Sequence, residues 1–146
     1  MASVSVYLNF SGETEEAFTF YKSVFGGEFD GGIYRFSEIP PSDEMPSVPE
    51  EVADLVMHIS FPIMGGVFTL MGSDAPESMG FNCTQGNNVY INLQPDSKEE
   101  TERLFRELSE GGVIEHELSE TFWQAYYGSC TDKFGVQWMF NFDMRE

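Results

Sequence analysis

Few side chains in this sequence have the type and spacing that catalysis or metal binding requires. The two cysteines, Cys83 and Cys130, form no metal-binding or redox motif, and no base stands near Cys130 in the sequence to activate its thiol. His58, in the stretch "VMHISF", is the candidate general base, with Asp74 on the following strand as a carboxylate partner. A purely structural role for His58 is the alternative, and His116 in "EHE" is typical of a solvated strand edge.

Two further side chains stand out near the C-terminus. Trp123, in "FWQAYYG", offers an indole surface on which a planar or cationic ligand could stack, although it could equally anchor the core. Asp132, in "TDKFG", has the position of a residue that fixes its own turn.

The chain repeats itself at about half its length. "VYLNF" at 6–10 returns as "VYINL" at 89–93, and both stretches are followed by an acidic pair and then by a glycine pair at nearly the same offset. Such a period indicates a duplicated structural module, with coincidence as the alternative.

Hydrophobic periodicity gives each half the same order of elements. In the first half we expect strands at 4–10, 28–36, 54–63 and 66–74, with a helix that Thr14 caps and Gly26 ends. In the second half we expect strands at 88–93, 113–121, 123–131 and 136–142, with a helix capped by Ser97. The proline-rich stretch 37–51 is expected to be a loop, either a lid or a plain connection.

The predicted fold class is therefore α+β, with two tandem βαβββ modules and eight strands in all. We expect a single domain over 1–146, made of module one at about 1–74, a linker at about 75–87 and module two at about 88–146. A helix covers only one face of each twisted sheet, so the other faces are expected to be concave and to enclose one cavity. A core filled by the same side chains is the alternative. The side chains predicted to line the cavity are Tyr7, Asn9, His58, Thr69, Tyr90, Asn92, Trp123, Gln137 and Met139.

Composition limits the classes of partner. Twenty-five acidic residues against seven basic ones give a net charge of −18, which repels nucleic-acid backbones and anionic membrane surfaces. The same charge serves solubility, attraction of a cationic ligand, or adaptation to high salt. The sequence contains no transmembrane segment and no basic leader before an apolar run, so a cytoplasmic location is expected.

The stretches "YLNFSGETEEAFTFYKSVFGGEF" and "TFWQAYYGSCTDKFGVQWMFNF" resemble the vicinal oxygen chelate superfamily, and more closely its PhnB-like branch. That superfamily includes glyoxalase I, extradiol dioxygenases and bleomycin-resistance proteins, and its PhnB-like members often carry a demethylubiquinone methyltransferase label. The resemblance covers nearly the whole chain and implies a glyoxalase-like fold and a homodimer, in which the modules pair within or across chains. In metal-dependent members, His, Gln and Glu on the first and last strand of each module hold a divalent ion. Those positions fall here on Ser5 or Val6, near Thr69, on Asn88 or Val89, and near Met139.

None of those positions carries a histidine or a carboxylate, so we predict no metal and no cofactor. The predicted function is a metal-free small-molecule binding protein whose cavity takes an apolar or cationic ligand. The alternative is a lyase, isomerase or oxygenase that uses His58 as a base, or that binds a metal through residues in another register.

Overall fold

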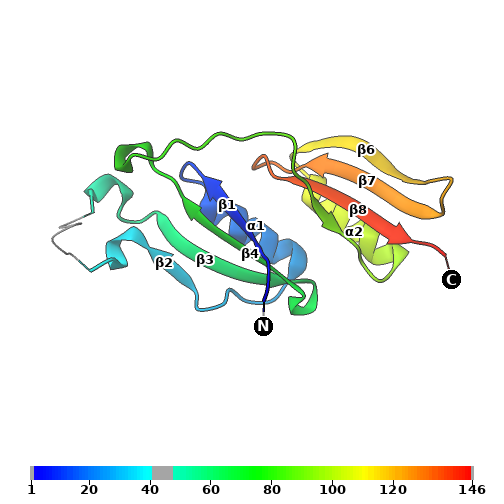
Figure 1. Cartoon of the computed structure of the whole chain (residues 1–146), viewed down its shortest axis with the longest axis horizontal. Coiled ribbons are helices and arrows are strands. Elements are labelled where there is room, and N and C mark those ends of the chain that lie inside the picture. The colour runs from blue at the N-terminus through cyan, green and yellow to red at the C-terminus, as the bar shows by residue number, and fades with distance from the viewer. Residues whose placement is uncertain (1, 41–47, 146) are drawn as a thin grey trace. The chain divides into compact units, whose positions relative to one another are not determined.

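The computed structural model describes residues 2–40 and 48–145, and the chain divides into two compact units, Met1–Thr84 and Gln85–Glu146 (Figure 1). The boundary falls inside the stretch predicted as a linker, 75–87. The two units are described separately below.

Unit one holds a helix and a four-stranded sheet. The strands are arranged in the order β1-β4-β3-β2, with β1 and β4 parallel and the other neighbours antiparallel. Its elements are β1 (Val6–Phe10), α1 (Thr14–Phe25), β2 (Ile33–Arg35), β3 (Val56–Ile63) and β4 (Phe68–Asp74). Among the described residues of this unit, four short 3₁₀ turns join them or follow them: η1 (Phe36–Glu38), η2 (Glu50–Val52), η3 (Met64–Gly66) and η4 (Glu77–Met79).

Unit two repeats the same plan. Its strands are arranged in the order β5-β8-β7-β6, again with the first pair parallel and the others antiparallel. Its elements are β5 (Ile91–Leu93), α2 (Lys98–Ser109), β6 (Val113–Glu120), β7 (Ala125–Thr131) and β8 (Gln137–Asp143). The predicted tandem βαβββ modules, with eight strands in two sheets, are confirmed.

Several predicted boundaries differ from the observed ones. The second strand covers only Ile33–Arg35 instead of 28–36, because Gly31 and Gly32 both have positive φ angles that interrupt an extended chain. Helix α1 begins at Thr14 itself, and its preceding residue Glu13 makes no side-chain cap, whereas Ser97 caps α2 as predicted by accepting from the Glu100 amide. Part of the predicted loop or lid at 37–51, residues 41–47, lies outside the described residues.

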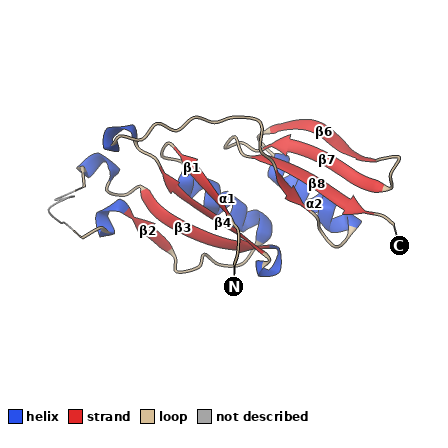
Figure 2. Ribbon diagram, viewed as in Figure 1, coloured by secondary structure: helices blue, strands red, loops and turns tan. Residues whose placement is uncertain are grey.

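Each helix packs against one face of the sheet in its own unit (Figure 2). Glycines in the strands allow the close approach: a methyl group at Gly72 would lie 2.8 Å from the Phe18 ring, and one at Gly128 would lie 3.0 Å from the Phe105 ring. The largest fully buried side chains include Phe18 and Tyr21 of α1 and Trp138 of β8. We call the face away from the helix the open face of each sheet.

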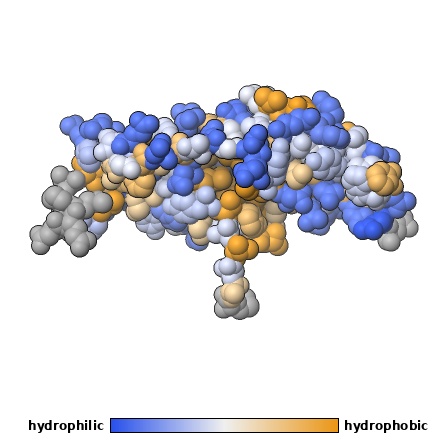
Figure 3. Space-filling view, turned by 45° about the horizontal axis from the view of Figure 1, so that its top comes forward, coloured by the Kyte–Doolittle hydropathy of each residue, from blue (hydrophilic) through white to orange (hydrophobic). Residues whose placement is uncertain are grey.

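Hydrophilic residues cover much of the surface visible in Figure 3, with apolar patches between them. In the described part of the chain, neither α1, α2 nor any shorter helical turn combines the length and hydropathy needed to span a bilayer.

Candidate functional site

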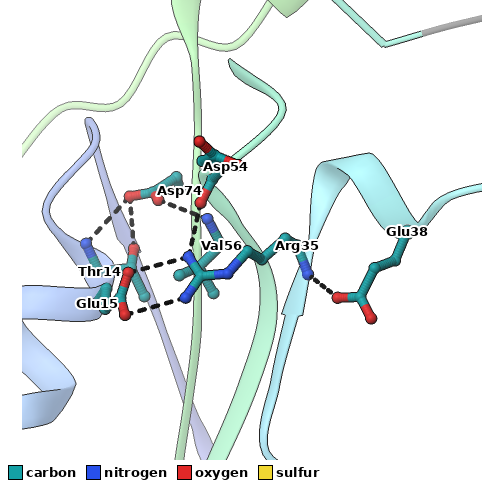
Figure 4. Close-up of polar contacts among 7 residues, drawn as sticks. All are labelled: Thr14, Glu15, Arg35, Glu38, Asp54, Val56 and Asp74. Atoms are coloured by element: carbon teal, nitrogen blue, oxygen red, sulfur yellow. Dashed lines mark hydrogen bonds and ion pairs between the residues drawn. The ribbon is translucent and has the colours of Figure 1, made fainter. Parts of the chain in front are cut away.

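The carboxylate of Asp74 fixes the end of the first sheet. Asp74 is buried at the end of β4, where Oδ1 accepts hydrogen bonds from the Gly12 and Thr14 amides and from the Thr14 hydroxyl. Its other oxygen accepts from the Val56 amide at 2.9 Å (Figure 4). The proposed pairing of Asp74 with His58 is therefore wrong, because the carboxylate is used to join α1 and β3 to the end of β4.

A second polar group lies beside Asp74, on the helix side of the sheet. Arg35 of β2 donates from both terminal nitrogens to the Glu15 carboxylate of α1 and also to the Asp54 carbonyl (Figure 4). The guanidinium lowers the pKa of Glu15. Arg35 pairs with Val56 across a β-bulge, so Val56 lies on this side of β3, opposite to the face of His58.

The open face of the first sheet brings together four predicted residues. Tyr7 and Asn9 project from β1 on the side away from α1, and Thr69 lies on the same face of β4. The Tyr7 hydroxyl oxygen lies 3.2 Å from Nδ1 of His58, and the two rings stack with centroids 5.8 Å apart. His58 therefore has a phenol as its partner, and Tyr7 remains 47% exposed.

The open face of the second sheet carries the counterparts of these residues. Asn92 pairs with Met139, and Gln137 lies on the same face of β8. On that face, Asn141 has a buried amide oxygen with no hydrogen-bond partner among residues 2–40 and 48–145. A buried acceptor without a donor is unfavourable, and a ligand or a water can satisfy it.

A pocket of about 450 Å³ opens on this face of unit two. Its volume lies in the range usual for small-molecule sites. The strands contribute Gln137 and Thr131, and the turns and the preceding segment contribute the rest. The residues that line it are Gln85, Gly86, Asn87, Glu115, Thr131, Gly135 and Gln137.

Glu115 lies on the pocket side of β6, on the same face as Val113, which pairs with the pocket residue Thr131. Ile114 pairs with Cys130 but His116 pairs with Ser129, so Glu115 is the extra residue of a bulge. The Tyr90 hydroxyl donates to its carboxylate at 2.9 Å, and this bond raises the pKa of Tyr90.

Two amides of the pocket are held in a defined orientation by the backbone. Gln137 donates through Nε2 to the Val89 carbonyl at 2.7 Å, and Gln85 donates through Nε2 to the Phe134 carbonyl at 3.0 Å. Gly135 leaves room for the Gln85 amide, because a methyl group there would lie 2.4 Å from its Oε1. Each amide therefore keeps its carbonyl oxygen as an acceptor.

The remaining predicted residues lie elsewhere. Trp123 belongs to the turn between β6 and β7, where it is 54% exposed and packs edge-on against Phe122, so its predicted alternative as a core anchor is wrong. Asp132 fixes its turn as predicted, accepting from two backbone amides and also from the Trp138 indole at 2.9 Å. Burial raises the pKa of the Cys130 thiol to about 12, so it is a poor nucleophile.

The comparisons with known proteins agree with this architecture. A family model described as 3-demethylubiquinone-9 3-methyltransferase matches residues 2–140. The chain belongs to this family. Protein YjdN of Escherichia coli (strain K12) is 34% identical over 145 residues, which cover 94% of this chain and 93% of that protein. The predicted PhnB-like branch, which carries the same label, is confirmed.

Solved structures show the same fold as this family member. Protein PA1353 from Pseudomonas aeruginosa is 36% identical, with a TM-score of 0.79 over 97% of this chain and 98% of that chain. A glyoxalase/bleomycin resistance protein/dioxygenase family enzyme from Burkholderia phytofirmans PsJN is 18% identical, with a TM-score of 0.61 over 95% of this chain and 96% of that chain. The second likeness shows the fold alone, and it confirms the predicted glyoxalase-like architecture.

The residues of this family member do not fit the divalent ion of the metal-dependent relatives. Ser5 donates to the Met71 sulfur at 3.8 Å. Thr69 and Met139, at two of the other expected ligand positions, supply no imidazole or carboxylate. Within 2–40 and 48–145, no three His, Cys, Asp or Glu side chains lie close enough to hold a metal ion.

Sequence reasoning missed most of the pocket. Gln85 and Asn87 fall in the predicted linker, and Glu115 belongs to the predicted solvated strand edge "EHE". The polar run "TQGNN" before the second repeat was the available signal for Gln85 and Asn87, and strand alternation from Val113 was the signal for Glu115.

Proposed function

We propose that this chain is a small-molecule binding protein of the glyoxalase/bleomycin-resistance fold that needs no metal ion. The observation that carries this proposal is the open face of the second sheet, with its pocket and with two oriented amide groups in the pocket lining. Ligand sites commonly combine concave surface with a few fixed polar groups. The open face of the first sheet, with Tyr7, Asn9 and His58, is the second surface on which a ligand would bind.

The test is a thermal-shift screen of the purified chain. The screen uses a library of small organic molecules, several divalent ions, and S-adenosylmethionine because the family description names a methyltransferase. Binding of an organic molecule raises the melting temperature by mass action, while metal analysis of the purified chain finds no stoichiometric ion. A stoichiometric metal, or stabilisation by divalent ions alone, would contradict the proposal, and stabilisation by S-adenosylmethionine would favour methyl transfer.

One observation favours a second candidate, an enzyme of the lyase, isomerase or oxygenase class. The Tyr7 hydroxyl and His58 Nδ1 form a phenol–imidazole pair on an open face, and such a pair can move a proton. Mass spectrometry of each ligand found in the screen, after incubation with wild type and with His58→Asn, decides between binding and turnover. Conversion by wild type that His58→Asn abolishes would replace the binding proposal with the enzymatic one.

The proposal also covers the oligomeric state and the location in the cell. We propose a homodimer, because the edge strands of open sheets favour pairing unless they are covered. Light scattering after gel filtration would give twice the mass of one chain, and a clean monomer would refute this part. A cytoplasmic location follows from the sequence arguments above and is tested by cell fractionation.

A further inference from the structure

We propose that the pocket of unit two selects organic cations, binding an ammonium or guanidinium group with Glu115 as counter-ion and the amide oxygens of Gln85 and Gln137 as further acceptors. The inference rests on the proposed binding function and specifies its ligand class.

The side chains that line the pocket offer several hydrogen-bond acceptors. Gln85 and Gln137 each donate an amide N–H to a backbone carbonyl, and their carbonyl oxygens remain as acceptors. Glu115 is a carboxylate with two oxygens, of which one accepts from Tyr90. A carboxylate has about four acceptor positions, so this bond leaves it with further capacity. The Glu115 carboxylate brings acceptors and no donor to the pocket, which suits a group that carries several N–H donors.

The charge of the pocket lining also favours a cation. Glu115 is the one charged side chain among the seven residues that line the pocket, and the other side chains there are neutral amides, a hydroxyl and glycines. An anionic ligand would face the Glu115 carboxylate, which repels it. Lys133 in the adjacent turn lies over the Phe134 ring at 5.7 Å and is not part of the lining.

The charge of the whole chain is also negative. A net charge of −18 produces a negative potential that concentrates cations near the surface. This field does not distinguish one cation from another, but it favours a cation over a neutral molecule of the same shape. Because Glu115 is exposed, water and salt weaken its attraction, and the amide oxygens must provide the geometry.

The experiment compares two probes of nearly equal shape, benzylamine and benzyl alcohol, on the full chain labelled with ¹⁵N. We expect benzylamine to shift the amide signals of Gln85, Thr131 and Gly135, and to bind at least about fivefold more tightly than benzyl alcohol, as about 1 kcal/mol of charge-assisted bonding gives. Raising the salt concentration should reduce the difference.

The variant Glu115→Gln should weaken benzylamine binding about fivefold while leaving benzyl alcohol unchanged. Glu117→Gln is the matched control, because Glu117 is an exposed glutamate on the same strand and is absent from the pocket lining. Equal affinity for the two probes, an effect of Glu117→Gln as large as that of Glu115→Gln, or shifts confined to other surfaces would overturn the inference. If Glu115→Gln does not fold, the comparison of probes on the native chain decides the question.

The outcomes separate this inference from the proposed function. Stabilisation by neutral molecules without a preference for benzylamine refutes cation selection and leaves the binding function intact. Stabilisation by calcium but not by benzylamine would identify the acceptors as an ion site and refute both. If neither the library nor benzylamine binds, both proposals fail.

Discussion

Replacing Asp74 should weaken unit one more than any change of an exposed acidic residue. The buried carboxylate accepts four hydrogen bonds, from the amides of Gly12, Thr14 and Val56 and from the Thr14 hydroxyl, at 2.7 to 3.1 Å. These bonds join the start of α1, the start of β3 and the end of β4. Asp74→Ala therefore removes every acceptor and leaves donors without partners near the core.

The magnitude follows from the number and kind of these bonds. A buried donor left without a partner costs about 1–3 kcal/mol, and a bond to a charged acceptor is stronger than a neutral one. Water can reach some of the vacated space, so the sum is not additive, and we expect Asp74→Ala to cost about 3–5 kcal/mol of the free energy of unfolding. Asp74→Asn keeps one oxygen for Thr14 but turns its amide group toward the Val56 N–H, which should cost about 2 kcal/mol.

Urea denaturation of the full chain, followed by circular dichroism, measures the change in free energy. Hydrogen exchange of the Thr14 and Val56 amides gives a local reading, and both amides should exchange faster in the variants. Asp54→Asn is the matched control, because the Asp54 side chain is exposed and its backbone carbonyl still accepts from Arg35. A loss below about 1 kcal/mol for Asp74→Ala, or exchange no faster than in Asp54→Asn, would refute the reasoning.

Three further predictions concern unit two. Glu115→Gln should lower the pKa of Tyr90 toward its ordinary value, because the carboxylate that accepts from the phenol is lost. A pH titration of the tyrosine ring signals by NMR measures this shift. An unchanged pKa of Tyr90 would contradict the contact. Burial raises the pKa of the Cys130 thiol to about 12, so this thiol should resist iodoacetamide at about pH 8 until urea unfolds the chain. Peptide mass spectrometry measures the labelling. Rapid labelling of the native chain would contradict the burial of Cys130. Gly112→Ala should lower the free energy of unfolding by about 3 kcal/mol or more, because the added methyl would lie 2.2 Å from the Thr131 carbonyl oxygen. Urea denaturation followed by tryptophan fluorescence measures this loss. A stability equal to that of wild type would contradict the packing.

The hydrophobic pattern was sufficient to predict the fold. The repeat of "VYLNF" as "VYINL" and the alternation of apolar residues in each strand depend on local physics, namely which side chains face a helix. Phe10, Trp138 and Phe140 are buried as that pattern required. The same pattern placed Tyr7 and Asn92 on open faces, where the structure has them.

The site could not be predicted to the same extent, because it depends on exceptions to the pattern. The bulge between β2 and β3 places Val56 on the face opposite to His58, and hydrophobic alternation carries no signal for a single extra residue. The partner of His58 required knowing that Asp74 was already committed to three backbone amides, a question of tertiary contacts. Trp123 lies at a hairpin turn, where burial cannot be inferred from its type.

The two units differ where the duplicated sequence keeps one residue and changes its partner. Tyr7 and Tyr90 hold equivalent places in the repeat, and both hydroxyls contact a titratable side chain on the open face of their own sheet. In unit one that partner is the His58 imidazole, whereas in unit two it is the Glu115 carboxylate. Shared residues therefore keep the scaffold and the phenol, and the changed partner gives each face a different polar group. The carboxylate suits the cation proposed for unit two, and the imidazole suits the proton transfer considered for unit one.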